Sequence, residues 1–206
     1  MPFVGRGGLK LEEALDRFGV DVRGLVGLDI GASTGGFVDC LLKRGAARVY
    51  AVDVDTKQLD WGLSKDPRVV DDREERPASS GRQTSPRRPD IVTMDVSFIS
   101  VLKILPALAA VPGGWTLVSL VKPQFEAGPE GRRPTRASSA TRPSTPRSWP
   151  GSWPGPGSSA SGSPGLMRCS TRGQKGNVEF FARWVKGDPD LNAESRPSLD
   201  QGGGQP

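Results

Sequence analysis

One stretch, residues 27–37, limits the folds open to this chain more than any other. It reads Gly-Leu-Asp-Ile-Gly-Ala-Ser-Thr-Gly-Gly-Phe and joins an apolar run at residues 25–30 to a helix-like segment at 37–42. A buried strand that turns on glycines into a helix presents backbone N–H groups to a nucleotide-like ligand, because glycine has no Cβ to hold the ligand away. The pattern alone fits an ordinary strand-to-helix turn equally well.

An acidic residue follows this turn at the spacing of a nucleotide-binding fold. Asp53 ends the next apolar run, about twenty residues after the turn, where an acid commonly binds ribose hydroxyls. The glycine turn and Asp53 together predict a Rossmann-like ligand site. The alternative is that Asp53 is an ordinary surface carboxylate.

Strands and helices alternate along the first part of the chain, which predicts a mostly parallel sheet in an α/β fold with helices on both faces. Expected strands occupy residues 25–30, 48–53, 68–70, 90–96 and 115–121, and expected helices occupy 9–18, 37–42, 57–65 and 100–110. Ligands of such sheets bind beyond the carboxyl ends of the strands. The polar residues expected to converge there are Asp29, Asp53, Asp95 and Lys122.

Composition excludes several kinds of chemistry. The chain contains no histidine, which removes Ser-His-Asp and Cys-His catalysis and histidine-ligated metals. Its two cysteines, Cys40 and Cys169, lack CxxC spacing, so neither a disulfide framework nor a zinc site is indicated. No apolar run approaches the roughly twenty residues of a membrane span. We therefore expect a cytoplasmic protein that uses no metal and no membrane.

Two stretches contain too few aliphatic residues for a folded core. Residues 71–88 are charged and rich in Pro and Ser, and Leu166 is the only Leu, Ile or Val in 131–174. Such segments bury too little apolar surface to offset their ordering entropy. We expect one folded domain made of residues 1–130 and 175–186, a disordered insert at 131–174 and a flexible tail at 187–206. The sheet is expected to be incomplete near 71–88 and 131–174. The net charge of +5 is weak support for a nucleic-acid partner, because much of the basic excess lies in that insert.

Five motifs carry a resemblance to a known family. They are Gly-Arg-Gly-Gly-Leu-Lys-Leu at 5–11, Asp-Ile-Gly-Ala-Ser-Thr-Gly-Gly-Phe at 29–37, Met-Asp-Val-Ser-Phe-Ile-Ser at 94–100, Leu-Val-Lys-Pro-Gln-Phe-Glu at 120–126 and Lys-Gly-Asn-Val-Glu-Phe at 175–180. In this order they resemble the TlyA (haemolysin A) family of FtsJ-like ribosomal RNA 2'-O-methyltransferases, over roughly two thirds of the chain. The resemblance implies a seven-stranded Rossmann-like sheet that acts on ribosomal RNA or ribosomal subunits. It also implies an N-terminal S4 RNA-binding module, which we expect to be absent here.

The same resemblance implies a catalytic set of Lys, Asp, Lys and Glu, which the motifs carry onto Lys10, Asp95, Lys122 and Glu179. A ribose 2'-hydroxyl is a poor nucleophile, so methyl transfer gains from a positioned base. A lysine can be that base only in its neutral form, which burial or a neighbouring positive charge favours. We expect Lys122 to be the base and Asp95 to orient it. Glu179 is expected to hold Lys10 or the ribose.

S-adenosylmethionine is the cofactor that the resemblance implies, bound at the glycine turn. Gly31 and Gly35 are expected beneath its methionine part and Asp53 at its ribose. The full expected cofactor-binding set is Asp29, Gly31, Ala32, Ser33, Thr34, Gly35, Gly36, Phe37, Asp53 and Asp95.

Each of these interpretations has an alternative. A lysine at a helix start or strand end is usually a solvated surface charge, Asp95 could cap the following helix, and Glu179 could face solvent. A second functional hypothesis is a catalytically impaired remnant that binds cofactor or RNA but cannot assemble the four catalytic residues. Membrane lysis, which the haemolysin name suggests, is unsupported because the sequence contains no basic amphipathic helix of useful length.

The two anomalous segments, from about residue 75 to 88 and from about 132 to 173, depart from the family's pattern as a whole. Shifted reading of a GC-rich gene yields Arg, Pro, Ser, Gly and Ala, which dominate both segments. Synonymous codons for residues 135–149 can be chosen so that a neighbouring frame resembles the family. Paired frame errors are therefore an alternative to a disordered insert, and an uninterrupted frame on resequencing would exclude them.

Overall fold

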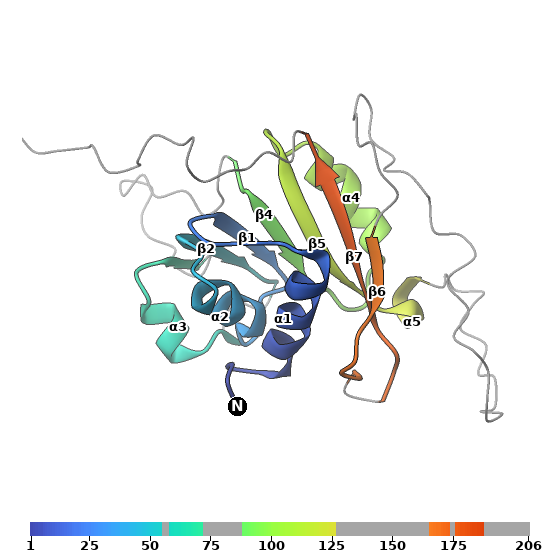
Figure 1. The fold of residues 1–206 in the computed structure, drawn as a ribbon, viewed down its shortest axis with the longest axis horizontal. Coiled ribbons are helices and arrows are strands. Elements are labelled where there is room, and N and C mark those ends of the chain that lie inside the picture. Colours follow the sequence, from blue (N-terminus) through green and yellow to red (C-terminus); the bar gives the residue numbers. More distant parts are fainter. Residues whose placement is uncertain (55–57, 72–87, 127–164, 174–175, 188–206) are drawn as a thin grey trace, which may run out of the picture.

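The computed structural model describes residues 1–54, 58–71, 88–126, 165–173 and 176–187, which form a seven-stranded sheet with helices packed against it (Figure 1). The strands are β1 (Val26–Ile30), β2 (Arg48–Val52), β3 (Val69–Asp71), β4 (Ile91–Met94), β5 (Trp115–Val121), β6 (Gly165–Arg168) and β7 (Phe180–Lys186). The helices are α1 (Arg6–Phe18), α2 (Gly36–Lys43), α3 (Trp61–Lys65), α4 (Val101–Ala109) and α5 (Pro123–Glu126).

The strand order is β3-β2-β1-β4-β5-β7-β6. Neighbouring strands from β3 to β5 are parallel, whereas β7 runs antiparallel to both β5 and β6. The chain leaves β1 toward β2 on one side and returns to β4 on the other, so the direction of winding reverses between β1 and β4. Ligands of parallel sheets bind at the carboxyl edge of such a reversal. The predicted mostly parallel α/β sheet is confirmed.

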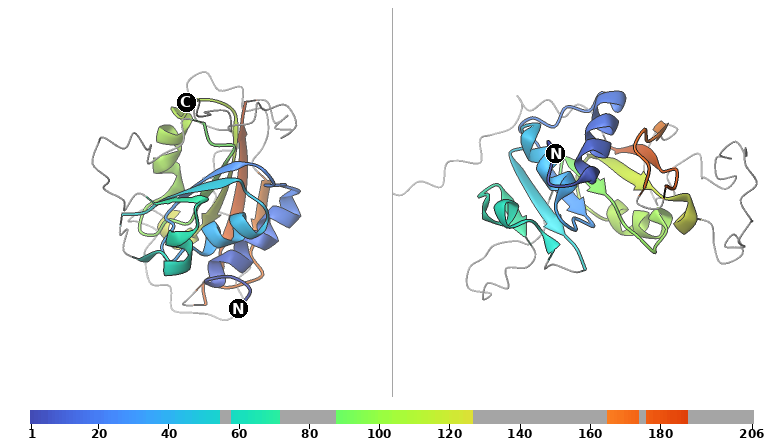
Figure 2. Two further views of the ribbon diagram at one scale, coloured as in Figure 1. Left: turned by 90° about the vertical axis from the view of Figure 1, so that its left-hand side faces the viewer. Right: turned by 90° about the horizontal axis from the view of Figure 1, so that it is seen from below.

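Two apolar cores attach helices to the two faces of the sheet. Helices α1, α2 and α3 lie on one face and α4 on the other, as the right-hand view of Figure 2 shows. The first core contains Leu15, Leu41 and Phe181, and the second contains Leu105 and Trp115. Each such fully buried side chain contributes roughly 1.5–3 kcal/mol of transfer free energy. The prediction of helices on both faces is therefore confirmed.

The expected strands and helices of the first 126 residues are found, with shifts of a few residues at their ends. The first helix shows a shift that matters for function. It begins at Arg6, after an extended Gly5, so Lys10 lies in its second turn and is buried instead of standing at the helix start. Gly19 ends the helix with a positive φ of 61°, as glycine does at many helix C-termini.

Strand β6 corrects one prediction. Composition predicts no order and a gap in the sheet over 131–174, yet Gly165–Arg168 pairs with β7. Met167 and, just after the strand, Cys169 are buried, whereas Leu166, the only Leu, Ile or Val in that stretch, is exposed. A count of Leu, Ile and Val therefore misses the apolar side of this strand. Residues 131–164 and 174 of that stretch, as well as 72–87 and 188–206, lie outside the described residues.

Helices α1 and α2 approach each other through glycines. A Cβ at Gly8 would stand 2.5 Å from the Cβ of Phe3 and 2.9 Å from the carbonyl oxygen of Gly36. A Cβ at Gly36 would stand 3.1 Å from the Gly8 nitrogen. Only glycine tolerates such contacts without displacing a neighbour. The close crossing places the N-terminal end of α1, with Lys10, beside the glycine turn that precedes α2.

Two glycines allow backbone strain and lost packing space to be measured separately. Gly19 has no atom within 4 Å of the place a Cβ would take, whereas a Cβ at Gly35 (φ 95°) would collide with Leu59 and Leu63. We expect Gly19→Ala to lower the free energy of unfolding by about 1 kcal/mol. Gly35→Ala should lower it by roughly 1–3 kcal/mol more. Urea denaturation measures both, and equal losses would show that the two leucines move aside freely.

Candidate active site

A cleft of about 650 Å³ opens at the carboxyl edge of the sheet, where β1, β4 and β5 end. This volume lies in the range of small-molecule and cofactor sites. Its walls come from the N-terminal end of α1, the turn after β1, the loop after β4, the turn at α5 and residues 177–179. Segments far apart in the sequence therefore meet at the reversal of strand order, as the strand-end argument predicts.

Gly31 begins the turn after β1 and lines the cleft with a positive φ of 83°. A Cβ on this residue would stand 2.6 Å from the carbonyl oxygen of Asp95. Its N–H donates a hydrogen bond of 2.8 Å to the carbonyl oxygen of Val52. The turn thus touches the ends of both neighbouring strands, and both its backbone angle and its contacts require glycine.

Most of the residues expected to bind a cofactor line the cleft: Gly31, Ala32, Ser33, Thr34, Gly36, Phe37 and Asp95. Ser33 adopts a positive φ of 48°, which is uncommon outside glycine. Its N–H donates a hydrogen bond of 2.8 Å to the Asp53 carboxylate. Its hydroxyl lies 3.2 Å from the side-chain oxygen of Gln58. Asp53 therefore fixes the turn while lying just outside the cleft lining.

Gly35 and Asp29 also lie outside the cleft lining, for different reasons. Gly35 faces Leu59 and Leu63, so packing against these side chains accounts for the glycine. Asp29 lies inside β1, directly before the turn, and is completely buried. Both residues therefore support the conformation of the turn and do not line the cleft.

The Asp29 carboxyl has an unusual environment. Its Oδ1 accepts a hydrogen bond of 2.7 Å from the Thr93 hydroxyl, and no hydrogen-bond partner among the described residues reaches its Oδ2. Burial raises the pKa of Asp29 to about 7; the Thr93 hydrogen bond opposes this rise, and the charges of Asp95 and Asp53 add to it. A carboxyl group that changes protonation near neutral pH therefore lies next to the turn.

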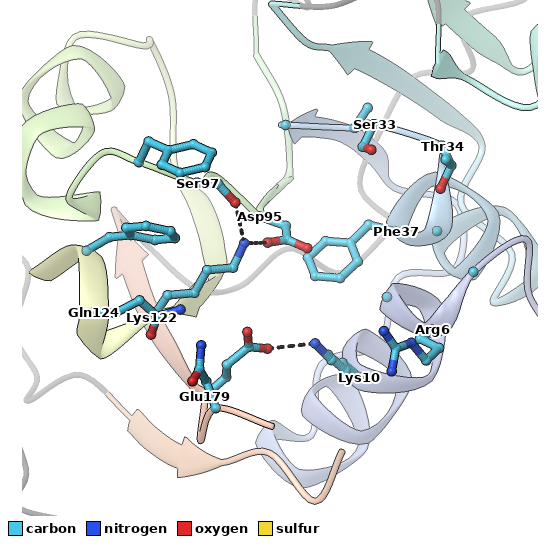
Figure 3. Close-up of a pocket in the computed structure, with 18 of the residues that line it drawn as sticks. Arg6, Lys10, Ser33, Thr34, Phe37, Asp95, Ser97, Lys122, Gln124 and Glu179 are labelled. Carbon is cyan, nitrogen blue, oxygen red and sulfur yellow. Dashed lines mark hydrogen bonds and ion pairs between the residues drawn. The ribbon is translucent and has the colours of Figure 1, made fainter. Parts of the chain in front are cut away.

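Lys122 and Asp95 form an ion pair at the ends of two neighbouring parallel strands, β5 and β4. The Nζ of Lys122 lies 2.6 Å from Oδ1 of Asp95 and donates a hydrogen bond of 2.9 Å to the Ser97 hydroxyl (Figure 3). The Lys122 side chain is only 12% exposed. Ser100, and not Asp95, caps α4, because its hydroxyl accepts a hydrogen bond from the Leu102 N–H. The alternative of Asp95 as a helix cap is therefore wrong.

Lys10 and Glu179 form a second ion pair in the same cleft, with Nζ 2.6 Å from Oε2 and side chains 11% and 6% exposed. Gly173 makes room for the Glu179 carboxylate, whose carbon would lie 2.9 Å from a Cβ at that position. The Ser170 hydroxyl donates a hydrogen bond of 2.7 Å to Glu13 on α1. The loop between β6 and β7 therefore contacts α1 at two points, through Glu179 and through Ser170.

The structure brings all four predicted catalytic side chains together. Figure 3 shows the Lys122 pair and the Lys10 pair facing the same space, beside the turn that carries Ser33 and Thr34. Neither lysine is a solvated surface charge, and Glu179 does not face solvent. The alternatives that treat these residues as ordinary surface groups are therefore wrong.

Besides Met1, six further side chains line the cleft that have no role assigned from the sequence: Arg6, Ser97, Phe98, Gln124, Phe125 and Asn177. The rings of Phe98 and Phe125 lie 5.1 Å apart between centroids, and Phe98 is 85% exposed with a φ of 67°. All six lie inside the five motifs, which is the signal that could have identified them. A motif does not say which of its side chains point into a cleft.

Comparison with known proteins shows the family to which the chain belongs. The sequence matches the family described as FtsJ-like methyltransferase over residues 3–138. The 16S/23S rRNA (cytidine-2'-O)-methyltransferase TlyA of Mycobacterium tuberculosis is 46% identical over 127 residues, which are 61% of this chain and 47% of that protein. The chain therefore spans about half the length of this curated relative. The predicted resemblance to the TlyA family is confirmed.

Solved structures agree with the fold. A candidate hemolysin from Streptococcus thermophilus is 35% identical with a TM-score of 0.66, over 94% of this chain and 73% of that one. A candidate S-adenosylmethionine dependent methyltransferase from Listeria monocytogenes is 14% identical with a TM-score of 0.50, over 88% of this chain and 99% of that one. The second likeness concerns the fold alone. The Rossmann-like methyltransferase fold is confirmed.

Among the residues that the structure describes, none of the helices is long and apolar enough to cross a membrane. In the same part of the chain, no three Cys, Asp or Glu side chains form a group suited to a metal ion.

Removing one member of the Lys10–Glu179 pair should lower the free energy of unfolding by more than the intact pair contributes to it. We expect Lys10→Met or Glu179→Gln to lower the free energy of unfolding by about 3 kcal/mol, because the remaining charge stays buried without its partner. The double variant should lose clearly less than the sum of the two. Urea denaturation of the cycle measures this, with the exposed pair Arg23–Asp21 as a control whose coupling should stay below about 1 kcal/mol. Additive losses at Lys10 and Glu179 would contradict the expectation.

Asp29→Asn should change how stability depends on pH. Folded Asp29 keeps its proton up to a pKa of about 7, whereas unfolded aspartate loses it near pH 3.9. The stabilisation from the protonated form is therefore complete below pH 4 and is lost as the pH rises to 7. Asparagine does not titrate, so the free energy of unfolding of the variant relative to the natural chain should rise by on the order of 3 kcal/mol over this interval. Denaturation curves at several pH values measure this difference in the free energy of unfolding. A difference that stays constant with pH would show that Asp29 is charged throughout and would contradict the expectation.

Proposed function

Since the chain belongs to the FtsJ-like methyltransferase family, we propose that it methylates the 2'-hydroxyl of ribose in ribosomal RNA, with S-adenosylmethionine as the methyl donor. The substrate class is suggested by the name of the Mycobacterium tuberculosis relative. Ribosomal RNA and ribosomal subunits are then the partners, and the cytoplasm is the place of action. The Lys122–Asp95 ion pair beside the glycine turn carries the proposal, because methylation of a weak hydroxyl nucleophile needs a positioned base next to a nucleotide-type site.

The glycine turn suits such a cofactor. Gly31 lines the cleft without a side chain, because its backbone angle and its contact with Asp95 both require glycine, and the cleft of about 650 Å³ is large enough for a ligand of this class. We assign the methionine part to the turn from Gly31 to Phe37, and the ribose to Asp53. When bound, S-adenosylmethionine supplies a methyl group on a positively charged sulfur, open to attack by an oxygen nucleophile.

Lys122 is the proposed base. In its neutral form, its Nζ accepts the proton of the ribose hydroxyl. Asp95 at 2.6 Å and Ser97 at 2.9 Å hold this nitrogen in one place, so the base is already aligned before the substrate arrives. The Asp95 carboxylate then stabilises the ammonium group that forms, as its ion-pair partner at 2.6 Å.

Lys10 and Glu179 are proposed to orient the substrate ribose. An ammonium group has three N–H donors, and the Glu179 carboxylate occupies one of those on Lys10. The remaining donors face the cleft, where they can bind sugar oxygens. Because the pair is almost fully buried, its geometry is fixed before the substrate enters, which lowers the entropic cost of alignment.

Methyl incorporation tests the proposed base. We expect Lys122→Ala to lower the rate of methyl transfer from labelled S-adenosylmethionine to isolated ribosomal subunits at least about 100-fold, the usual worth of general-base catalysis. Cofactor affinity, measured by calorimetry, should change little because Lys122 is not assigned to the cofactor. Lys103→Ala, which removes an exposed lysine of α4 outside the cleft, is the matched control and should behave like the unchanged chain.

The outcomes separate the hypotheses. Methyl transfer that survives Lys122→Ala would refute Lys122 as the base. Cofactor binding without any methyl transfer by the unchanged chain would favour the alternative of a catalytically impaired cofactor- or RNA-binding remnant.

A further inference from the structure

Charge is not balanced among the side chains that line the cleft. The described lining residues include three basic side chains and two acidic ones: Arg6, Lys10, Lys122, Asp95 and Glu179. Each lysine is paired with one carboxylate at 2.6 Å. The Arg6 guanidinium makes no ion pair or hydrogen bond with any described residue, and the first turn of α1 contains no acidic side chain. The cleft therefore carries one uncompensated positive charge, at a defined place.

Arg6 lies one helical turn before Lys10 on the same side of α1, and Figure 3 shows both beside the cleft. Four residues of helix rise about 6 Å. The two differ in exposure, because Lys10 is buried and Arg6 is exposed. A ligand held at Lys10 by its sugar would therefore present the next part of its backbone to Arg6.

Two anions could meet this guanidinium, the carboxylate of the cofactor and a phosphate of the RNA. The cofactor carries two positive groups and one negative group, so its net charge adds to the positive charge of the cleft. A polyanionic strand gains from both charges. Arginine also matches phosphate geometry, with two parallel N–H donors. The charge balance therefore favours the phosphate.

We propose that Arg6 is a positioning residue for the RNA strand: its guanidinium binds a backbone phosphate next to the target ribose and sets the register of that ribose at Lys10 and Lys122. The inference rests on the proposed function for its substrate. Binding of RNA through Arg6 can nevertheless be measured without methyl transfer.

The test measures three quantities for Arg6→Ala, Arg6→Lys and the control Arg17→Ala, which removes an exposed arginine at the far end of the same helix. The first is the affinity for a fluorescein-labelled single-stranded RNA oligonucleotide at several salt concentrations. The second is cofactor affinity by calorimetry. The third is the split of methyl-transfer kinetics on ribosomal subunits into kcat and KM.

We expect Arg6→Ala to weaken RNA binding roughly fivefold to tenfold at low salt and to reduce the salt slope by about one, as the loss of one phosphate contact does. KM for ribosomal subunits should rise more than kcat falls. Cofactor affinity should stay within a factor of about two, since no cofactor contact is removed. Arg6→Lys should restore much of the binding but not all, because lysine keeps the charge and lacks the fork.

Other results overturn the inference in distinguishable ways. Unchanged RNA affinity and salt slope in Arg6→Ala, with active methyl transfer, would remove Arg6 from the RNA contact and leave the proposed function intact. A large loss of cofactor affinity would assign Arg6 to the cofactor carboxylate instead. If the unchanged chain transfers no methyl group but Arg6→Ala still reduces the salt slope of RNA binding, the RNA contact would be supported and the proposed function refuted. No measurable RNA binding by the unchanged chain would overturn the inference.

Discussion

The buried ion pair between Lys10 and Glu179 is the contact on which the candidate site depends most. It joins α1 to the start of β7 across 169 positions of sequence. Each end is anchored separately, because α1 crosses α2 at Gly8 and β7 pairs with β5 along seven residues. The pair therefore sets the distance between two walls of the cleft. A buried charge that loses its partner is costly, so this distance has little freedom.

The sequence allowed much of this arrangement to be predicted. Apolar periodicity and turn residues locate the elements up to residue 126, because parallel strands with both faces covered are short apolar runs. Strand-end logic then predicts that Asp95 and Lys122 meet, since β4 and β5 are neighbours with the same direction. Family resemblance supplied Lys10 and Glu179. Neither periodicity nor spacing relates these two, because only the antiparallel insertion of β7 beside β5 brings them together.

Other features could not be predicted because they depend on packing. Position 35 requires glycine because a Cβ there would collide with Leu59 and Leu63. The glycine motif does not include these two leucines. Asp29 has the position of a ligand-binding acid, yet it lies in the core, and its burial changes its protonation. Strand β6 was not predicted because its buried side chain is a methionine, and the buried residue just after the strand is a cysteine. In each case the chemical type of the residue was visible, whereas its surroundings were not.

The position of β7 has a consequence for how the protein comes into being during synthesis. This strand is the last in the described chain but lies inside the sheet, between β5 and β6. A nascent chain that has emerged only as far as β5 already contains the glycine turn and Lys122, but it lacks Glu179 and leaves one edge of β5 unpaired. The two walls of the cleft therefore meet only after β7 has been synthesised. An incomplete chain would be able to fold its first half while remaining without a finished site.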